Sequence, residues 1–136
     1  MSESIYILGA ARTPVGSFQG SLATQSAPEL GAHAMAAALA NGQVKADEVN
    51  EVIIGNVVSS GLKQAPARQA MRIAQLPDSC AATTINKVCG SGMKATMLAM
   101  DLIKAGSADT VVAGGMESMS NAPYLVAKAR AGLRMG

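Results

Sequence analysis

The chain has 136 residues, the size of one domain, and a domain of this length buries about two thirds of its unfolded surface. Hydrophobic residues make up 49% of it and charged residues only 15%, so part of its surface is expected to contact other protein. The net charge of +2 combines an acidic first half with a basic second half, but the basic residues are scattered and lack interleaved aromatic residues, which makes nucleic acid a poor candidate ligand.

The amino-terminal residues do not show the basic and apolar regions of a secretory leader. No later apolar run reaches the ~18 residues that a membrane span requires. We therefore expect a cytoplasmic protein without a membrane partner.

Seven elements are predicted in the order β-α-β-α-β-α-β. Short apolar runs rich in β-formers predict the strands, which cover residues 4–10, 51–58, 83–88 and 109–114. Apolar residues at helical spacing predict the helices, which run from the Ser26 N-cap to Gly42, over 67–76 and over 91–105. Strands that alternate with helices imply βαβ units, mostly parallel pairing and an α/β layered fold.

The third predicted helix, residues 91–105, is apolar over most of its circumference. Its polar residues fall along one narrow stripe: Ser91, Lys94, Asp101 and Lys104. Helices that are apolar nearly all round are buried. We therefore expect this helix to run through the core and to fix its own first turn rigidly.

Cys89 stands between the third predicted strand and this helix, in the run Asn86-Lys87-Val88-Cys89-Gly90-Ser91-Gly92. Free backbone N–H groups and the positive end of the helix dipole favour an anion at such a position, which makes a thiol there more reactive. Two interpretations remain open from the turn alone: a nucleophile, or a small buried apolar residue, which is the commonest fate of a free cysteine.

Cys80 precedes the same predicted strand without a charged or glycine-rich frame, and we predict that it serves packing. The strand between Cys80 and Cys89 separates them too far for a disulfide. The single histidine, His33, lies on the first predicted helix, where a packing or surface position is a stronger expectation than a catalytic base. One histidine and two separated cysteines do not form a metal site.

Residues 90–95 also fit the dinucleotide-binding pattern G-x-G-x-x-A between a strand and a helix. That pattern requires an acid at the end of the next strand, whereas Asp109 stands at its start and Glu117 lies too far beyond it. A dinucleotide-binding oxidoreductase is therefore the weaker alternative.

Four segments follow one another along the chain: Ala10–Gly16, Gln69-Ala70, Asn86–Ala95 and Ala113–Ser120. Their combination in this order is much more specific for a protein family than any one segment. Together they resemble the amino-terminal part of the thiolase family, of the acetyl-CoA C-acetyltransferase type. The resemblance implies the N-terminal half of a duplicated thiolase-like α/β fold. It further implies that residues 1–117 form an incomplete N-terminal domain and that residues 118–136 begin a loop region.

By this resemblance, Cys89 is the catalytic nucleophile that takes an acyl group from a coenzyme A thioester and becomes an acyl-cysteine. Covalent catalysis of this kind divides one difficult step into two. The family then condenses two acetyl-CoA to acetoacetyl-CoA or cleaves a 3-ketoacyl-CoA, and the N–H of Cys89 would supply half of an oxyanion hole. Coenzyme A thioesters are thus small-molecule substrates, no bound cofactor is implied, and the residues that contact coenzyme A stay unassigned.

The chain has no match to two further catalytic residues of the family, a histidine and a second cysteine, which belong to the carboxyl-terminal half of a longer chain. We therefore expect the 136 residues alone to be inactive. The resemblance also implies a homodimer or homotetramer at full length, with the third strand at the dimer interface. The remaining alternative is a non-catalytic acyl-CoA-binding module, in which Cys89 would be unreactive.

Overall fold

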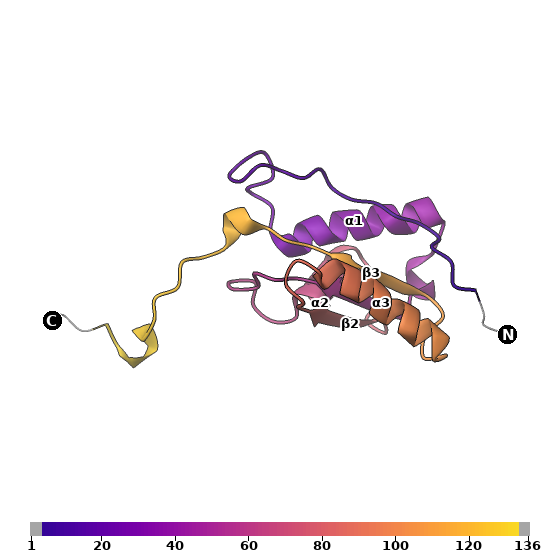
Figure 1. The fold of residues 1–136 in the computed structure, drawn as a ribbon. Coiled ribbons are helices and arrows are strands. Elements are labelled where there is room, and N and C mark those ends of the chain that lie inside the picture. Colours follow the sequence, from indigo (N-terminus) through magenta and orange to yellow (C-terminus); the bar gives the residue numbers. More distant parts are fainter. Residues whose placement is uncertain (1–3, 134–136) are drawn as a thin grey trace.

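The computed structural model describes residues 4–133 and places a parallel three-stranded sheet between two layers of helices (Figure 1). The strands, in the spatial order β2-β1-β3, are β1 (Glu51–Gly55), β2 (Ala81–Ile85) and β3 (Val111–Gly115). The helices are α1 (Ala27–Gly42), α2 (Pro66–Ile73) and α3 (Ser91–Lys104). The predicted α/β class and the parallel pairing are confirmed for these strands.

The core lies between the sheet and the pair of helices α1 and α2. Val52 and Ile54 of β1 pack there with Met35 of α1 and Met71 of α2, and all four side chains are buried. Ile53, between the two β1 residues, is buried as well. A central parallel strand with both faces covered needs such a continuous apolar run.

α1 begins with a capping box at the position that the sequence predicts. The Ser26 hydroxyl accepts from the backbone N–H of Glu29, and the Glu29 carboxylate accepts from the backbone N–H of Ser26 at 2.7 Å. This backbone N–H, followed by the Ser26 hydroxyl, lowers the pKa of Glu29 below its ordinary value of 4.5.

The capping box should make the stability of the fold depend on pH. Because the pKa of Glu29 is depressed in the folded state, its contribution to the free energy of unfolding is complete above pH 4.5 and is lost as the pH falls through the lowered value. Glutamine keeps hydrogen-bonding oxygen but does not titrate, so Glu29→Gln should show a shallower loss of stability below pH 4.5. Urea unfolding on both sides of that pH measures the difference, and parallel pH profiles would contradict it.

α3 contacts the other face of the sheet through its smallest side chains. Its buried residues are Ser91, Ala95 and Ala99, whereas Met93 is 74% exposed and Met97 is 48% exposed. The prediction that this helix runs through the core is therefore wrong for the part of the chain that the structure describes. Only one face of α3 meets another layer there, and apolar composition alone does not say which faces are covered.

The predicted first strand, residues 4–10, is not a strand in the structure. The segment runs alongside α1 (Figure 1), where a Cβ on Gly9 would overlap the carbonyl oxygen of Ala38 and the Asn41 amide donates to the carbonyl of Ala10. Its large apolar side chains are mostly exposed: Tyr6, Ile7 and Leu8. β-forming composition does not supply a partner strand, and none lies beside this segment within residues 4–133.

The other strands differ from the predictions at their ends. β1 stops at Gly55 rather than Val58. The N–H of Asn56 still donates to the carbonyl of Ile85 in β2, but the N–H groups of Val57 and Val58 donate to the Glu117 carboxylate instead of a neighbouring strand. β2 begins at Ala81 rather than Thr83, where it pairs with Glu51, and it ends at Ile85 before a turn. Such shifts follow from long-range pairing, which the local sequence does not encode.

Short 3-10 helices complete the structure: η1 (Ala46–Glu48), η2 (Met119–Asn121) and η3 (Ala129–Ala131). After β3 the chain leaves the sheet and extends away from it (Figure 1). Within the described residues β2 pairs only with β1, so its outer edge is open. No helix of this described part is long and apolar enough to span a membrane.

Candidate active site

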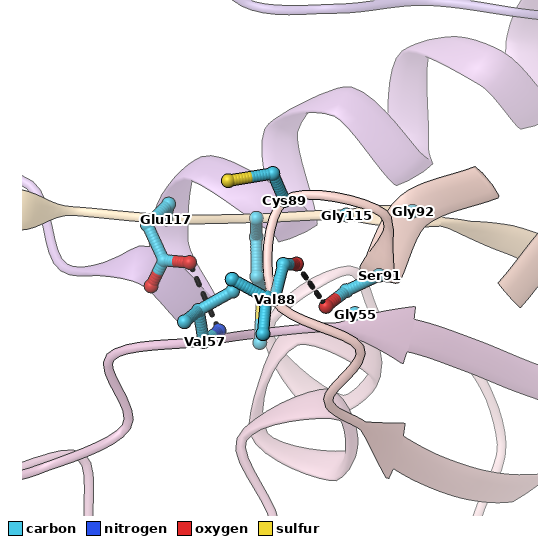
Figure 2. A pocket seen from close by; sticks show the side chains of 9 residues that line it. Gly55, Val57, Val88, Cys89, Ser91, Gly92, Gly115 and Glu117 are labelled. Atoms are coloured by element: carbon cyan, nitrogen blue, oxygen red, sulfur yellow. Dashed lines mark hydrogen bonds between the residues drawn. The ribbon is translucent and has the colours of Figure 1, made fainter. Parts of the chain in front are cut away.

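The carboxyl ends of all three strands and the start of α3 meet at one edge of the sheet. Gly55 is in register with Ile85 and with Gly115, so the strands end at the same level. A shallow depression of about 280 Å³ lies at this edge (Figure 2). It is lined by Gly55, Val57, Val88, Cys89, Ser91, Gly92, Gly115, Met116 and Glu117. Parallel α/β sheets bind ligands at this edge.

Glycines let α3 approach the sheet closely here. A Cβ on Gly55 would lie 2.5 Å from the Cβ of Ser91, and a Cβ on Gly92 would lie 3.4 Å from the backbone nitrogen of Gly115. The first turn of α3 therefore rests closely on the ends of β1 and β3, because neither strand end carries a Cβ at these contacts. This packing fixes the height of the preceding turn above the sheet.

The thiol of Cys89 lies on that turn. The turn leads into the end of α3 that faces the depression. The residue is exposed, and Figure 2 shows its sulfur on the outer side of the turn. α3 starts at Ser91 with Gly90 as its N-cap, so the thiol stands just before the first helical turn. The N–H groups of Gly92 and Met93 have no acceptor among residues 4–133. The exposure of Cys89 does not fit the alternative of a small buried residue, whereas its role as a nucleophile remains a prediction.

Glu117, on the opposite wall of the depression, accepts three hydrogen bonds. Asn56 Nδ2 donates to Oε1 at 2.8 Å, and the N–H of Val58 donates to the same oxygen at 3.0 Å. The N–H of Val57 donates to Oε2 at 2.9 Å (Figure 2). Asn56 Nδ2 also donates to the carbonyl of Met116 at 3.1 Å. The carboxylate thus joins the chain after β3 to the chain after β1 and shapes one side of the depression.

Glu117→Gln is expected to lower the free energy of unfolding by about 1 to 3 kcal/mol, because an amide nitrogen would face a backbone N–H that now donates to carboxylate. Urea unfolding measures this loss. Glu48→Gln is the matched control, since the Glu48 carboxylate is exposed and accepts from the backbone N–H of Lys45 at 2.7 Å. The control should stay within about 0.5 kcal/mol, and equal effects in the two variants would contradict a structural role of Glu117.

Cys80 occupies a different environment. It is 1% exposed, belongs to the core cluster and stands just before β2, whereas Cys89 follows the other end of that strand. Burial raises the pKa of its thiol, and the nearby Glu51 carboxylate acts in the same direction. Both cysteines are free. The predicted packing position of Cys80 and the absence of a bond between the two cysteines agree with this geometry.

The family model described as Thiolase, N-terminal domain, matches residues 5–136 of the chain. The chain belongs to the thiolase family. This thiolase sequence is 53% identical over 133 residues to acetyl-CoA acetyltransferase IA of Candida tropicalis and 52% identical over 135 residues to acetyl-CoA acetyltransferase of Escherichia coli. The alignments cover 97% and 98% of the chain but 33% and 34% of the relatives, so the chain spans about one third of their length.

A solved thiolase has the same fold. The crystal structure of Acat5 thiolase from Ascaris suum in complex with coenzyme A matches with a TM-score of 0.91 at 42% identity. The match covers 93% of this chain and 33% of that one. The resemblance inferred from four sequence segments is therefore confirmed for the family and for the N-terminal domain fold.

Of the other candidate residues of this thiolase domain, the structure brings Glu117 to the depression but not Asp109 or His33. The N–H of Asp109 donates to Asn50 beside the amino ends of the strands, and the Glu117 carboxylate is occupied by protein donors, so neither acid suits a dinucleotide ribose. His33 is exposed on α1, which packs against α2, and it does not line the depression. Among residues 4–133, no three potential metal ligands gather in one place.

The sequence offered Glu117 only as a candidate acid for a dinucleotide ribose. It did not reveal the hydrogen bonds that Glu117 accepts at the edge of the depression. Its partner Asn56 and the backbone groups beside it lie about 60 positions earlier in the chain. The local signal was its place just after a predicted strand, where α/β proteins bind ligands but where the solvated polar residues of a glycine turn are equally expected.

Proposed function

We propose that this thiolase domain accepts an acyl group from a coenzyme A thioester on Cys89. The proposal depends on one observation, the exposed thiol at the carboxyl edge of the sheet, over a depression and just before α3. The relatives named acetyl-CoA acetyltransferase and the solved thiolase with coenzyme A support acetyl-CoA or acetoacetyl-CoA as the substrate.

In the proposed step, the sulfur of Cys89 attacks the carbonyl carbon of the thioester. A bond forms between that carbon and Cys89, the bond to the coenzyme A sulfur breaks, and coenzyme A leaves as a thiol with the proton that Cys89 gives up. The N–H of Cys89 is the donor we assign to the developing oxyanion, and such a donor is worth about 3 to 4 kcal/mol in the transition state. Because glycines form the floor of the depression, a small acyl group can lie beside the sulfur.

In a thiolase chain of the relatives' length, the acyl-cysteine would react with a second acetyl-CoA in a condensation, or coenzyme A would cleave a 3-ketoacyl-CoA. Both directions need a general acid and base, and His33, the one histidine of the sequence, does not line the depression. We therefore propose that the 136 residues alone do not turn over acetoacetyl-CoA, since each missing group lowers the rate about 10²- to 10⁴-fold. Thiolysis that Cys89→Ser abolishes would contradict this.

We also propose that a thiolase chain of the relatives' length that contains this domain forms a homodimer or homotetramer. The open edge of β2 and the exposed apolar side chains of α3 support an assembly, because unpaired strand edges and apolar patches are contact surfaces. Light scattering of such a full-length chain at high protein concentration measures the mass of the assembly. A stable monomer would count against the proposed oligomer.

The direct test of the proposed function is acyl labelling. The chain is incubated with acetyl-CoA for long times, because the first step lacks a base, and is then digested and mapped by mass spectrometry. We expect one acetyl group on the peptide that contains Cys89, removable by hydroxylamine as a thioester is. Labelling that prefers Cys80, or that is spread over lysines and resists hydroxylamine, would contradict the proposal.

A further inference from the structure

The turn that carries Cys89 holds a β-branched residue in the left-handed region of the backbone map. Val88 has a φ of 49°. For a residue with a branched Cβ this conformation is a true outlier. Its cost corresponds to a factor of about 5 to 30 in population relative to the ordinary regions. Such a conformation persists only where the surrounding structure holds it.

Two side chains hold Val88 from its two ends. Asn86 Oδ1 accepts from the N–H of Val88 at 2.9 Å. The Ser91 hydroxyl donates to the carbonyl of Val88 at 2.6 Å (Figure 2). The Ser91 oxygen also accepts from the N–H of Lys87 at 2.8 Å. Ser91 is 4% exposed and its Cβ packs against Gly55, so the hydroxyl has little freedom to move.

The Ser91 hydroxyl is not the N-terminal cap of α3. The N-cap residue is Gly90, which has no side chain that could cap the helix. Both hydrogen bonds of the Ser91 hydroxyl go to residues before the helix. Its partners are instead the N–H of Lys87 and the carbonyl of Val88, which both belong to the turn before the helix. The hydrogen bonds therefore stabilise the turn, not the helix end.

We propose that Ser91 and Asn86 are positioning residues that keep Val88 left-handed and thereby fix the direction of the Cys89 thiol. Cys89 follows Val88 directly, so a change of the Val88 backbone angles would swing the Cα–Cβ bond of Cys89. A thiol held in one direction reaches an incoming carbonyl without a search over orientations. The purpose of this device rests on the proposed acyl transfer, whereas its geometry can be tested without it.

The test compares Ser91→Ala and Asn86→Ala with the unchanged chain by two measurements. The intraresidue amide–Hα NOE of Val88, which is strong in the left-handed region, should weaken in both variants. The rate constant for alkylation of Cys89 by iodoacetamide should fall about fivefold or more. In the double variant Ser91→Ala/Val88→Gly, the rate should return to near its original value, because glycine adopts positive φ without steric strain.

Asn50→Ala is the matched control. Asn50 is an exposed asparagine whose side chain accepts from the N–H groups of Asp109 and Thr110 at 2.9 Å each, at the opposite edge of the sheet. It should leave the Val88 NOE and the alkylation rate of Cys89 unchanged. Asn86 is exposed, so its variant carries the test if Ser91→Ala does not fold.

Three results would overturn the proposal: an unchanged NOE and rate in both Ser91→Ala and Asn86→Ala, an equal fall of the rate in Asn50→Ala, or no recovery in the double variant. Failure of the proposed function looks different. In that case the NOE and the alkylation rates behave as expected, while acetyl-CoA does not label Cys89 in any variant.

Discussion

Cys89→Ser is expected to remove acetyl labelling by acetyl-CoA completely. A serine hydroxyl without an adjacent base is a far weaker nucleophile than a thiol, part of which is already thiolate at neutral pH. Because Cys89 is exposed, the exchange should leave the fold and its stability unchanged within about 0.5 kcal/mol. Intact-mass spectrometry after incubation with acetyl-CoA measures the label.

The matched control for this variant is Cys80→Ala. It removes the other thiol, which is buried in the core, and should lower stability moderately while the label on Cys89 stays. A label that survives in Cys89→Ser, or that disappears in Cys80→Ala with the fold intact, would show that the acyl group goes elsewhere.

Gly55→Ala is expected to destabilise the fold at the upper end of the 1 to 3 kcal/mol that overpacking typically costs, about 3 kcal/mol. The new Cβ would lie 2.5 Å from the Cβ of Ser91 and 2.6 Å from its backbone carbonyl carbon, so the start of α3 would have to move away from β1. Because the turn with Cys89 is attached to that helix start, the alkylation rate of Cys89 should change as well. Urea unfolding measures the stability.

Gly114→Ala offers a control on the neighbouring strand. A Cβ on Gly114 of β3 would meet no atom within 4 Å. The same exchange should therefore change the free energy of unfolding by less than about 1 kcal/mol. Similar losses in both variants would mean that the contact between Gly55 and Ser91 does not hold α3 in place.

The order of the elements from α1 to β3 was predictable because its signals are local. The Ser26 cap and the glycine and proline residues between the elements mark where helices begin and end, and they do so whatever the rest of the chain does. The turn before α3 was predictable for the same reason. Its sequence placed Cys89 beside a helix start, and the structure adds that the thiol is exposed.

The features that were not predictable depend on contacts between distant residues. Residues 4–10 have the composition of a strand, but a strand also needs a neighbour, and this segment lies along α1 instead. The same holds for α3, whose methionines suggested burial on all sides although the sheet covers only its small residues. The hydrogen bonds of Glu117 join residues about 60 positions apart, so no local pattern could reveal them.

The division of the chain at residue 117 and the role of Cys89 in acyl transfer remain predictions. The comparisons show the family and the fold, and the chain spans about one third of the relatives that carry the acetyltransferase name. What the structure contributes to the role of Cys89 is its exposure and its place at the carboxyl edge of the sheet.

The central claim is that the fold exposes Cys89 and buries Cys80. Competitive alkylation tests this claim most directly. Folded protein is treated with iodoacetamide, and the modification of each cysteine is followed by peptide mapping, with the chain in concentrated urea as the reference. We predict that Cys89 reacts at least about 10²-fold faster than Cys80 in the folded chain, because Cys80 is buried, with 1% of the residue exposed, and reacts only when the core opens. The two rates should become similar in urea. Equal, slow modification of both cysteines in folded protein would contradict the account.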